Sequence, residues 1–309
     1  MPVKTKRKIK PVNIAVVDIG SNSVRLAIYR LIGTTHALVY EKKAVCGLAR
    51  GLSHKRLRLD RKGMTLTLKA LRKFRRITNK RKTHKVLAIG TAAMRTVAAT
   101  RKGRAFHCRA ERALGHKIAV ISGRREARLT ALGMMAALPK ASGICGDLGG
   151  GSLELAMIKR GRVGHTVTLA LGSLTLITES GGEALKAEAL MHARLNLVPW
   201  LKKAKGKTFY PIGGSWRAVA RVMMHMQGHK IRRIHGYRIG AGLAKKYAEI
   251  IARKKTSAFR KMHKKIRHRA DVIPFAAAAL AELIARMRPV RIVFSAHGVR
   301  EGIVRVYRG

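Results

Sequence analysis

Acidic residues are scarce in this chain. Only 14 of its 309 residues are Asp or Glu, against 67 Lys and Arg, which gives a formal net charge of +53. Charged residues make up an ordinary 26 %, so the sign of the charge, and not its amount, is unusual. Such a charge attracts polyanions, which leaves nucleic acid, polyphosphate and anionic lipid as candidate partners. A solvated surface that follows a compositional bias explains it equally well, because the basic residues are spread along the whole chain.

Cysteines are few and long apolar runs are missing. Cys46, Cys108 and Cys145 are odd in number and widely spaced, so we expect reduced, mostly buried thiols. No apolar run reaches the length of a membrane span, and residues 1–10 lack the apolar stretch of a signal peptide. We therefore expect a cytoplasmic protein that makes no membrane contact. Residues 1–10 are interpreted as a basic tail or an anion-binding arm.

A glycine-rich turn occurs twice in the chain. Asp18-Ile19-Gly20-Ser21-Asn22-Ser23 is echoed by Asp147-Leu148-Gly149-Gly150-Gly151-Ser152, a separation of 129 residues (147 − 18). Each copy joins two apolar runs that have the length of strands. Glycines let backbone N–H groups approach an anion closely, and an Asp at a strand end is suited to hold a metal ion beside it. Two matched turns predict two similar halves that bind a phosphate chain between them.

Ordinary β-hairpins are the alternative interpretation, because glycine-rich turns between apolar strands are common. The repeated Asp argues against it, since a chain this poor in acid rarely places two carboxylates at equivalent positions by chance.

The order of the expected elements is also duplicated. Strands are predicted over 13–19, 23–31 and 35–42, and again over 143–148, 152–159 and 163–170, each trio followed by alternating helices and strands. A long helix is expected over 182–204, with a new start or a bend at Pro199, and helices fill 239–287 with a break near Pro274. This pattern is typical of an α/β protein with two mixed sheets and a cleft between them.

Six motifs in combination resemble the Ppx/GppA family, the exopolyphosphatases and guanosine pentaphosphate phosphohydrolases. Besides the two turns, the motifs are Thr91-Ala92-Ala93-Met94-Arg95, Ile121-Ser122-Gly123-Arg124-Arg125-Glu126-Ala127-Arg128, Gly213-Gly214-Ser215 and Ser295-Ala296-His297-Gly298-Val299-Arg300-Glu301-Gly302. The resemblance runs from about Val12 to the end and looks like the short two-domain form.

The resemblance implies duplicated actin-like, sugar-kinase-like (ribonuclease H-like) domains around a cleft. We place the first domain at 1–123 and the second at 124–309, with the last helix, about 299–309, free to pack back on the first domain. The implied activity is release of terminal phosphate from inorganic polyphosphate or guanosine pentaphosphate by a metal-assisted water.

Each part of that reaction has candidate residues. Backbone N–H groups of Gly20, Ser21, Asn22, Ser23, Gly149, Gly150, Gly151 and Ser152, with the guanidinium of Arg95, are predicted to bind phosphate. Asp18 and Asp147 are predicted to hold Mg²⁺ or another divalent cation. Glu126 is the general base that the resemblance implies, and Glu154 is a second ligand for the metal or the water. The family usually has two adjacent carboxylates here, and Arg125 replaces the first; we expect Arg124 and Arg125 to depress the pKa of Glu126.

Other classes of function stay open. A polyanion-binding protein with little turnover, taking polyphosphate or RNA, fits the charge but leaves Asp18, Glu126 and Asp147 without a purpose. An ATPase or kinase of the same fold has no need of Glu126. The sequence leaves open the choice between polyphosphate and nucleotide, the presence of non-specific RNA binding, and a homodimer.

Overall fold

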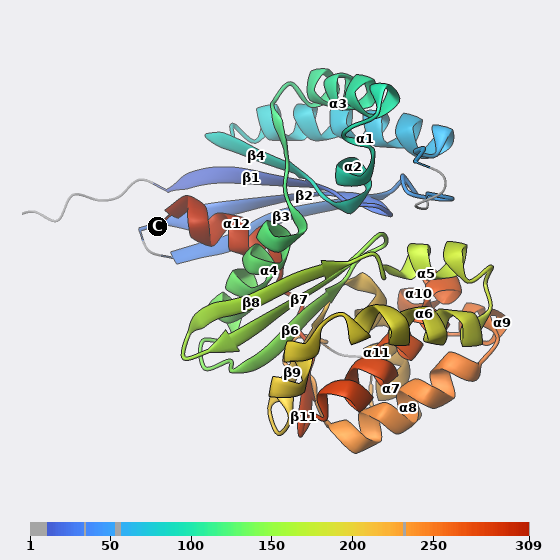
Figure 1. Cartoon of the computed structure of the whole chain (residues 1–309). Helices are drawn as coiled ribbons and strands as arrows, with labels where there is room; N and C mark the ends of the chain where they lie inside the picture. Colours follow the sequence, from blue (N-terminus) through green and yellow to red (C-terminus); the bar gives the residue numbers. More distant parts are fainter. Residues whose placement is uncertain (1–10, 34, 53–56, 231–232, 309) are drawn as a thin grey trace, which may run out of the picture.

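The protein contains two mixed β-sheets with helices on both faces of each (Figure 1). The computed structural model describes residues 11–33, 35–52, 57–230 and 233–308. The basic segment 1–10 considered above lies outside the described residues. No helix of the described chain is long and apolar enough to cross a membrane.

The first sheet has five strands in the order β3-β2-β1-β4-β5. Its strands are β1 (Val12–Ile19), β2 (Ser23–Ile32), β3 (Thr35–Val45), β4 (Lys85–Gly90) and β5 (Ile118–Val120). Strands β1, β2 and β3 form an antiparallel meander, whereas β4 and β5 join β1 in parallel.

The second sheet has six strands in the order β10-β11-β9-β6-β7-β8. Its strands are β6 (Gly143–Leu148), β7 (Leu153–Lys159), β8 (Arg162–Leu169), β9 (Thr208–Ile212), β10 (Arg238–Gly240) and β11 (Arg291–Val293). Strands β6, β7 and β8 repeat the meander, and β9 and β11 repeat the parallel pair. The two sheets thus share one plan, to which β10 adds an edge strand. The expected α/β class, with duplicated halves of the ribonuclease H-like order, is confirmed.

Four helices border the first half. These are α1 (Arg61–Lys80), α2 (Ala92–Val97), α3 (Arg101–Leu114) and α4 (Gly123–Ala137). Asp60 caps α1 by accepting a hydrogen bond from the backbone of Gly63, and α3 stops at Gly115, whose φ of 77° is the left-handed geometry that ends many helices.

The helices of the second half are more broken than the sequence suggested. They are α5 (Ser173–Glu179), α6 (Ala184–Asn196), the 3₁₀ turn η1 (Pro199–Ala204), α7 (Gly214–Met226), α8 (Ala241–Arg253), α9 (Thr256–Arg260), α10 (Lys264–Arg267), the 3₁₀ turn η2 (Ala270–Val272), α11 (Ile273–Met287) and α12 (Val299–Arg308). Pro199 starts η1 and Pro274 lies in the first turn of α11, where proline is tolerated. Helix α5 and strand β10 were not anticipated, because each is too short to show a hydrophobic period.

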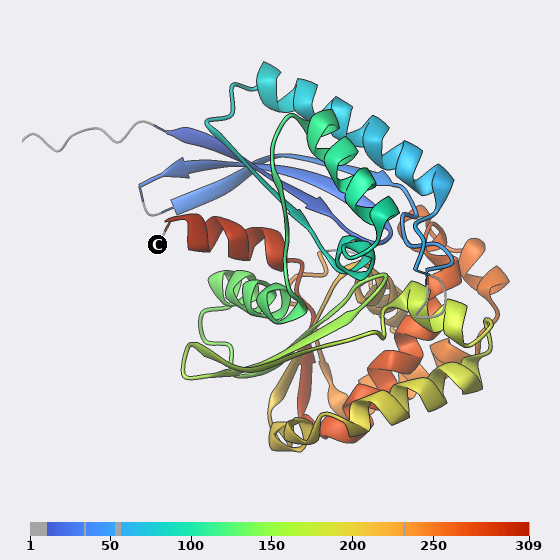
Figure 2. The ribbon, with the colours of Figure 1, turned by 45° about the horizontal axis from the view of Figure 1, so that its top comes forward.

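Buried side chains stack in layers that follow the elements. Along β1, Ala15 and Val17 pack with Phe74 and Phe106 of α1 and α3, while the alternate residue Val16 packs with α4 and α12. Such burial of both faces explains why the strand reads as an unbroken apolar run. Figure 2 shows α4 and α12 lying between the two sheets.

Helices α4 and α12 approach each other closely enough to bring their backbones into contact. Helix α12 packs against β1 and α4, and α4 packs in turn against β7 and β8. A Cβ atom on Gly133 would lie 2.6 Å from the backbone nitrogen of Gly302 and 2.9 Å from the carbonyl carbon of Gly298. Only glycine fits at such a crossing, so this contact fixes how the two halves meet.

We predict that Gly133→Ala destabilises the protein, because its methyl group would push the backbones of α4 and α12 apart. The expected loss is about 1–3 kcal/mol, the usual cost of overpacking. Urea unfolding measures it. The matched control is Gly242→Ala in α8, where a Cβ meets nothing within 4 Å; this change should be neutral or stabilise by about 0.5–1 kcal/mol. Equal effects of the two changes would contradict the role given to the crossing.

Candidate functional site

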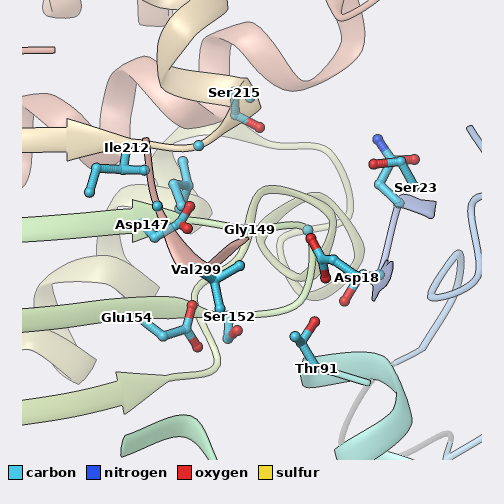
Figure 3. Close-up of a pocket in the computed structure, with 18 of the residues that line it drawn as sticks. Asp18, Ser23, Thr91, Asp147, Gly149, Ser152, Glu154, Ile212, Ser215 and Val299 are labelled. Atoms are coloured by element: carbon cyan, nitrogen blue, oxygen red, sulfur yellow. The ribbon is translucent and has the colours of Figure 1, made fainter. Parts of the chain in front are cut away.

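A pocket of about 120 Å³ lies where the two halves face each other. Its wall is formed by the β1–β2 turn, the β6–β7 turn, and the segments that begin α2, α4, α7 and α12. Each of these segments follows the end of a strand, which is the usual position of sites in α/β folds. Figure 3 shows Asp18 and Thr91 on one side of the pocket and Asp147, Glu154 and Ser215 across from them.

The two glycine-rich turns have the same local geometry. In the first turn the N–H of Gly20 donates to the carbonyl of Ser23 (3.1 Å), and in the second the N–H of Gly149 donates to the carbonyl of Ser152 (3.0 Å). These four residues are equivalent in the repeat. The sequence duplication is therefore also a duplication of backbone structure.

The turns touch each other across the pocket. A Cβ on Gly151 would lie 2.7 Å from the hydroxyl oxygen of Ser21, and one on Gly150 would lie 3.0 Å from the Cβ of Ser21. Larger side chains would separate the two turns. The glycines thus let backbone N–H groups from both halves reach one small ligand.

The structure brings nearly all the predicted site residues together. Asp18, Glu126, Asp147, Glu154 and every turn residue predicted to bind phosphate line the pocket. Arg95 does not line it. Its guanidinium instead contacts two carboxylates, so the expected contact between Arg95 and phosphate stays a prediction.

Asp18 and Asp147 lie at the ends of β1 and β6. Burial raises the pKa of both carboxyls, that of Asp147 to about 6, partly offset for Asp147 by Arg217 and Arg25. Among the described residues no group of three or more His, Cys, Asp or Glu is arranged to hold a metal ion. A pair of carboxylates nevertheless fits Mg²⁺, which is usually held by one or two carboxylates together with substrate phosphates and water.

Glu126, Glu154 and Arg95 form a compact charged group beside this pair. Nη1 of Arg95 lies 3.0 Å from Oε2 of Glu126, and Nη2 lies 3.6 Å from Oε1 of Glu154. Nη1 also donates to the carbonyl of Ile121 (2.9 Å), and the hydroxyl of Thr168 donates to Glu154 (2.8 Å). Arg95 is thereby held against both carboxylates.

Burial raises the pKa of both carboxyls, that of Glu154 to about 7 and that of Glu126 well above its usual range. The charge of Glu154 raises the pKa of Glu126 further, whereas Arg95 lowers it. The expectation that Arg124 and Arg125 depress this pKa is wrong. Both are exposed on the outer side of α4, while Glu126 points inward with a side chain only 12 % exposed.

The sequence analysis missed a group of arginines in the pocket wall. They are Arg25, Arg217, Arg269 and Arg300. Arg300 lies inside a recognised motif, and Arg25, two residues after the first turn, occupies the repeat position of Glu154, so a signal was present. For Arg217 and Arg269 there was little signal, because nothing in a chain with 67 Lys and Arg marks which of them are buried.

Glu301 is a further pocket residue that was not predicted. It lies at the start of α12, where Gly298-Val299-Arg300-Glu301 matches Gly123-Arg124-Arg125-Glu126 of α4. The hydroxyl of Tyr29 donates to it (2.6 Å), as does the N–H of Gly298 (2.8 Å). Burial favours the neutral acid, but Arg300 and these hydrogen bonds lower the pKa of Glu301 overall. These two hydrogen bonds use the carboxylate of Glu301 to hold the start of α12 in place.

Fold and pocket together define a class of protein. Two halves of the same sheet order present backbone donors, strand-end carboxylates and arginines to one cleft, an arrangement suited to binding phosphate groups. The chain belongs to the Ppx/GppA phosphatase family, because the family's sequence model matches residues 27–306.

Curated relatives cover part of the same region. A guanosine-5′-triphosphate,3′-diphosphate pyrophosphatase of Pseudoalteromonas atlantica is 28 % identical over 162 residues, 52 % of this chain and 31 % of the relative. The enzyme of that name from Aeromonas hydrophila is 28 % identical over 176 residues, 57 % of this chain and 35 % of the relative. The match thus spans about a third of these longer proteins.

Solved structures match almost the whole chain. An exopolyphosphatase-like protein superposes with a TM-score of 0.85 at 22 % identity, covering 96 % of this chain and 98 % of the other. An exopolyphosphatase from Cytophaga hutchinsonii gives 0.84 at 20 % identity, with 96 % and 97 % covered. The Aquifex aeolicus Ppx/GppA enzyme gives 0.76 at 22 %, with 96 % and 99 % covered. These likenesses establish the fold.

We predict that Arg95→Gln raises the pKa of Glu126, because the positive charge that favours its carboxylate form is lost. Carboxyl ¹³C chemical shifts followed against pH measure this pKa, and the scarcity of acidic residues keeps the spectrum simple. Arg124→Gln, an exposed change on the same helix, should leave it unchanged. If both variants titrate like the unmodified protein, the Arg95–Glu126 pair does not control this carboxyl.

Proposed function

We propose that the chain hydrolyses the terminal phosphoanhydride bond of inorganic polyphosphate or of guanosine pentaphosphate. The observation that carries the proposal is the position of Glu126. Its carboxyl lines the pocket in which the two glycine-rich turns meet, and Arg95 holds it at 3.0 Å. A carboxylate placed beside an anion-binding cradle is suited to activate water for attack on a phosphate.

The turns bind the substrate in this proposal. N–H groups of residues 21–23 and 150–152 donate to oxygens of the terminal phosphates from opposite sides. The N–H groups of Gly20 and Gly149, also expected to bind phosphate, instead donate to carbonyls within their own turns. Backbone donors on rigid turns need little reorganisation as charge builds up, which lowers the barrier. Arg25 and Arg300 add positive charge from the wall.

Glu126 acts as the base. Its carboxylate takes a proton from a water molecule as the water oxygen forms a bond to the terminal phosphorus. The bond from that phosphorus to the bridging oxygen breaks, and the rest of the phosphate chain leaves with the electron pair. The raised pKa of Glu126 makes its carboxylate a stronger base than an exposed Glu, and Arg95 keeps it oriented.

Asp18 and Asp147 would hold a divalent cation beside the phosphates. When bound, such an ion neutralises charge on the phosphate oxygens and on the leaving group. Glu154 holds Arg95 from its other side and lies next to Asp147 in the β6–β7 ladder. We therefore assign Glu154 to positioning Arg95 and the water.

The net charge of +53 supports a second candidate, a polyanion-binding protein with little turnover. Phosphate release from guanosine pentaphosphate and from long-chain polyphosphate, assayed with and without Mg²⁺, distinguishes the two. Binding without release would favour the second candidate, and RNA added as a competitor would report how general the binding is.

We predict that Glu126→Gln retains substrate binding but lowers kcat by about 10²–10⁴-fold, the usual contribution of a general base. Gln has the shape of Glu and cannot take the proton. Single-turnover phosphate release and a separate binding titration measure the two effects, with Arg128→Gln on the exposed side of α4 as the control. A variant that keeps a tenth of the activity would move the role to another residue.

Hydrolysis should require a divalent cation and Asp147. Asp147→Asn removes the charge but keeps the side chain's size, so kcat should fall by orders of magnitude while the melting temperature stays the same or rises. The rise is expected because burial already disfavours the charged form of Asp147. Full activity of the unmodified protein in excess chelator would exclude the metal.

A further inference from the structure

Basic residues are concentrated in two segments of the first half. Segments 61–82 and 101–117, which contain α1 and α3, hold 16 Lys and Arg among 39 residues and a single acid, Glu111. The other 270 residues hold 51 Lys and Arg and 13 acids. A uniform compositional bias would give both parts the same ratio of basic to acidic residues. The charge of the two segments is therefore a separate feature of the molecule.

The cations of these segments are exposed, and almost none of them is paired. Every Lys and Arg of 61–82 and 101–117 is exposed. Within the described chain, Lys117 alone among them forms an ion pair, with Glu111 at 3.5 Å. The carboxylate of Glu111 is already in use, because the backbone N–H of Ile118 donates to it (2.9 Å). The protein thus leaves this positive charge unbalanced.

Helices α1 and α3 lie side by side on the side of the first sheet that faces away from the second half (Figure 1, Figure 2). Phe74 and Phe106, on their buried sides, pack against one face of β1, whereas α4 and α12 cover the other face. No residue of α1 or α3 lines the pocket between the halves. We call the exposed Lys and Arg of 61–82 and 101–117 the outer basic face, and its position separates it from the candidate active site.

The outer basic face is broad as well as long. Helix α1 has 20 residues and so extends over about 30 Å. Two neighbouring helices, each about 10–12 Å across, give the face a width of about 20 Å. Arg75 of α1 reaches over to the end of α3, where a Cβ on Gly115 would lie 2.8 Å from its Nε. A single phosphate chain contacts one strip of such a surface, whereas a nucleic-acid duplex presents the phosphates of two strands to it.

The face offers no aromatic side chain on which an unpaired base could stack. Its two segments contain no Tyr or Trp, and their two Phe residues, Phe74 and Phe106, are buried. Proteins that hold single strands combine cations with exposed aromatic side chains. A duplex keeps its bases inside and presents phosphates and sugars, which fits a face made of cations.

The shape of the face favours double-stranded RNA. Because α1 is packed along its length against α3, neither helix is free to enter the major groove of B-DNA, which is about 12 Å wide. Double-stranded RNA is recognised mostly by its shape and its backbone, without entry into its narrow major groove. An anionic membrane fits less well, because inserted apolar side chains strengthen such binding and Leu66 alone among the large apolar residues of these segments is exposed.

We propose that the outer basic face binds double-stranded RNA through its phosphate backbone, whatever the base sequence. The Lys and Arg of α1 contact one strand and those of α3 the other, and each contact releases a counterion from the duplex. This activity goes beyond the hydrolysis proposed for the pocket. It is also independent of that hydrolysis, since the two surfaces share no residue.

The test measures binding of a labelled RNA duplex of about 16 base pairs, the span of a typical double-stranded RNA-binding domain, by fluorescence anisotropy at a series of KCl concentrations. The variant combines Arg72→Gln, Lys73→Gln and Arg76→Gln, three exposed changes in the middle of α1 that keep a good helix former. The dissociation constant should rise by about 10-fold or more, and the slope of log K against log salt should become shallower by about 2–3, since each lost phosphate contact contributes about 0.9.

The matched control combines Lys202→Gln, Lys203→Gln and Lys205→Gln, which remove the same charge from exposed positions on the second half. This control should change the affinity and the slope little. If it weakens binding as much as the α1 variant does, the duplex responds to net charge and the outer basic face is not a binding site. Should the α1 variant fail to fold, a variant with Arg101, Arg109 and Arg112 of α3 changed to Gln takes its place, and the same comparison decides.

Competition against the labelled duplex identifies the partner. The competitors are unlabelled RNA duplex, one of its single strands, a DNA duplex of the same length, long-chain polyphosphate and phosphatidylserine vesicles, compared at equal phosphate concentration. Unlabelled RNA duplex should compete best, and a better competitor among the other four would overturn the assignment to double-stranded RNA. Phosphate release from guanosine pentaphosphate is assayed separately and should be the same in the α1 variant as in the unmodified protein. A chain that releases no phosphate but binds the duplex through this face would contradict the proposed function alone.

Discussion

The backbone contact between α4 and α12 is the constraint on which the site depends. Helices normally pack with their axes about 8–10 Å apart, separated by side chains. Here Gly133 and Gly302 remove that layer, so the first turns of both helices reach the same cleft. The two glycine-rich turns can then touch through Ser21 and Gly151, and Glu126 and Glu301 both line the pocket.

The charged residues of the pocket fall into distinct groups. Glu126 and Glu154 share Arg95, Arg300 is balanced by Glu41, and the strand-end pair Asp18 and Asp147 stays free of any ion pair within 4 Å in the described chain. Arg217 and Arg269 lie near the amino end of α7 and form no ion pair within 4 Å in the described chain. Arg217 is nevertheless close enough to lower the pKa of Asp147, so the strand-end carboxylates and these cations act on each other without direct pairing.

The two halves share one fold, and differences between equivalent residues give the site its chemistry. The Asp at the end of the first strand is kept in both halves, whereas the paired position on the next strand is Arg25 in one half and Glu154 in the other. Glu126 and Glu301 occupy the same place in equivalent helices. Glu301 accepts hydrogen bonds from Tyr29 and the backbone of Gly298, while Glu126, within the described residues, accepts a side-chain hydrogen bond from Arg95. The same backbone position thus serves structure in one half and remains accessible for chemistry in the other.

The sequence by itself determined the two-sheet plan and the turns, because the strands are apolar runs and the Asp-x-Gly pattern repeats in register. It also indicated the family, and it marked Asp18, Glu126, Asp147 and Glu154, since acids stand out in a chain that has few. Only the tertiary structure decided the surroundings of these groups. Burial, and not the neighbouring Arg124 and Arg125, controls the pKa of Glu126, and Arg95 turned out to contact carboxylates. Arg217 and Arg269 could not be singled out among so many basic residues, because what distinguishes them is their burial in the pocket wall, which no local pattern records.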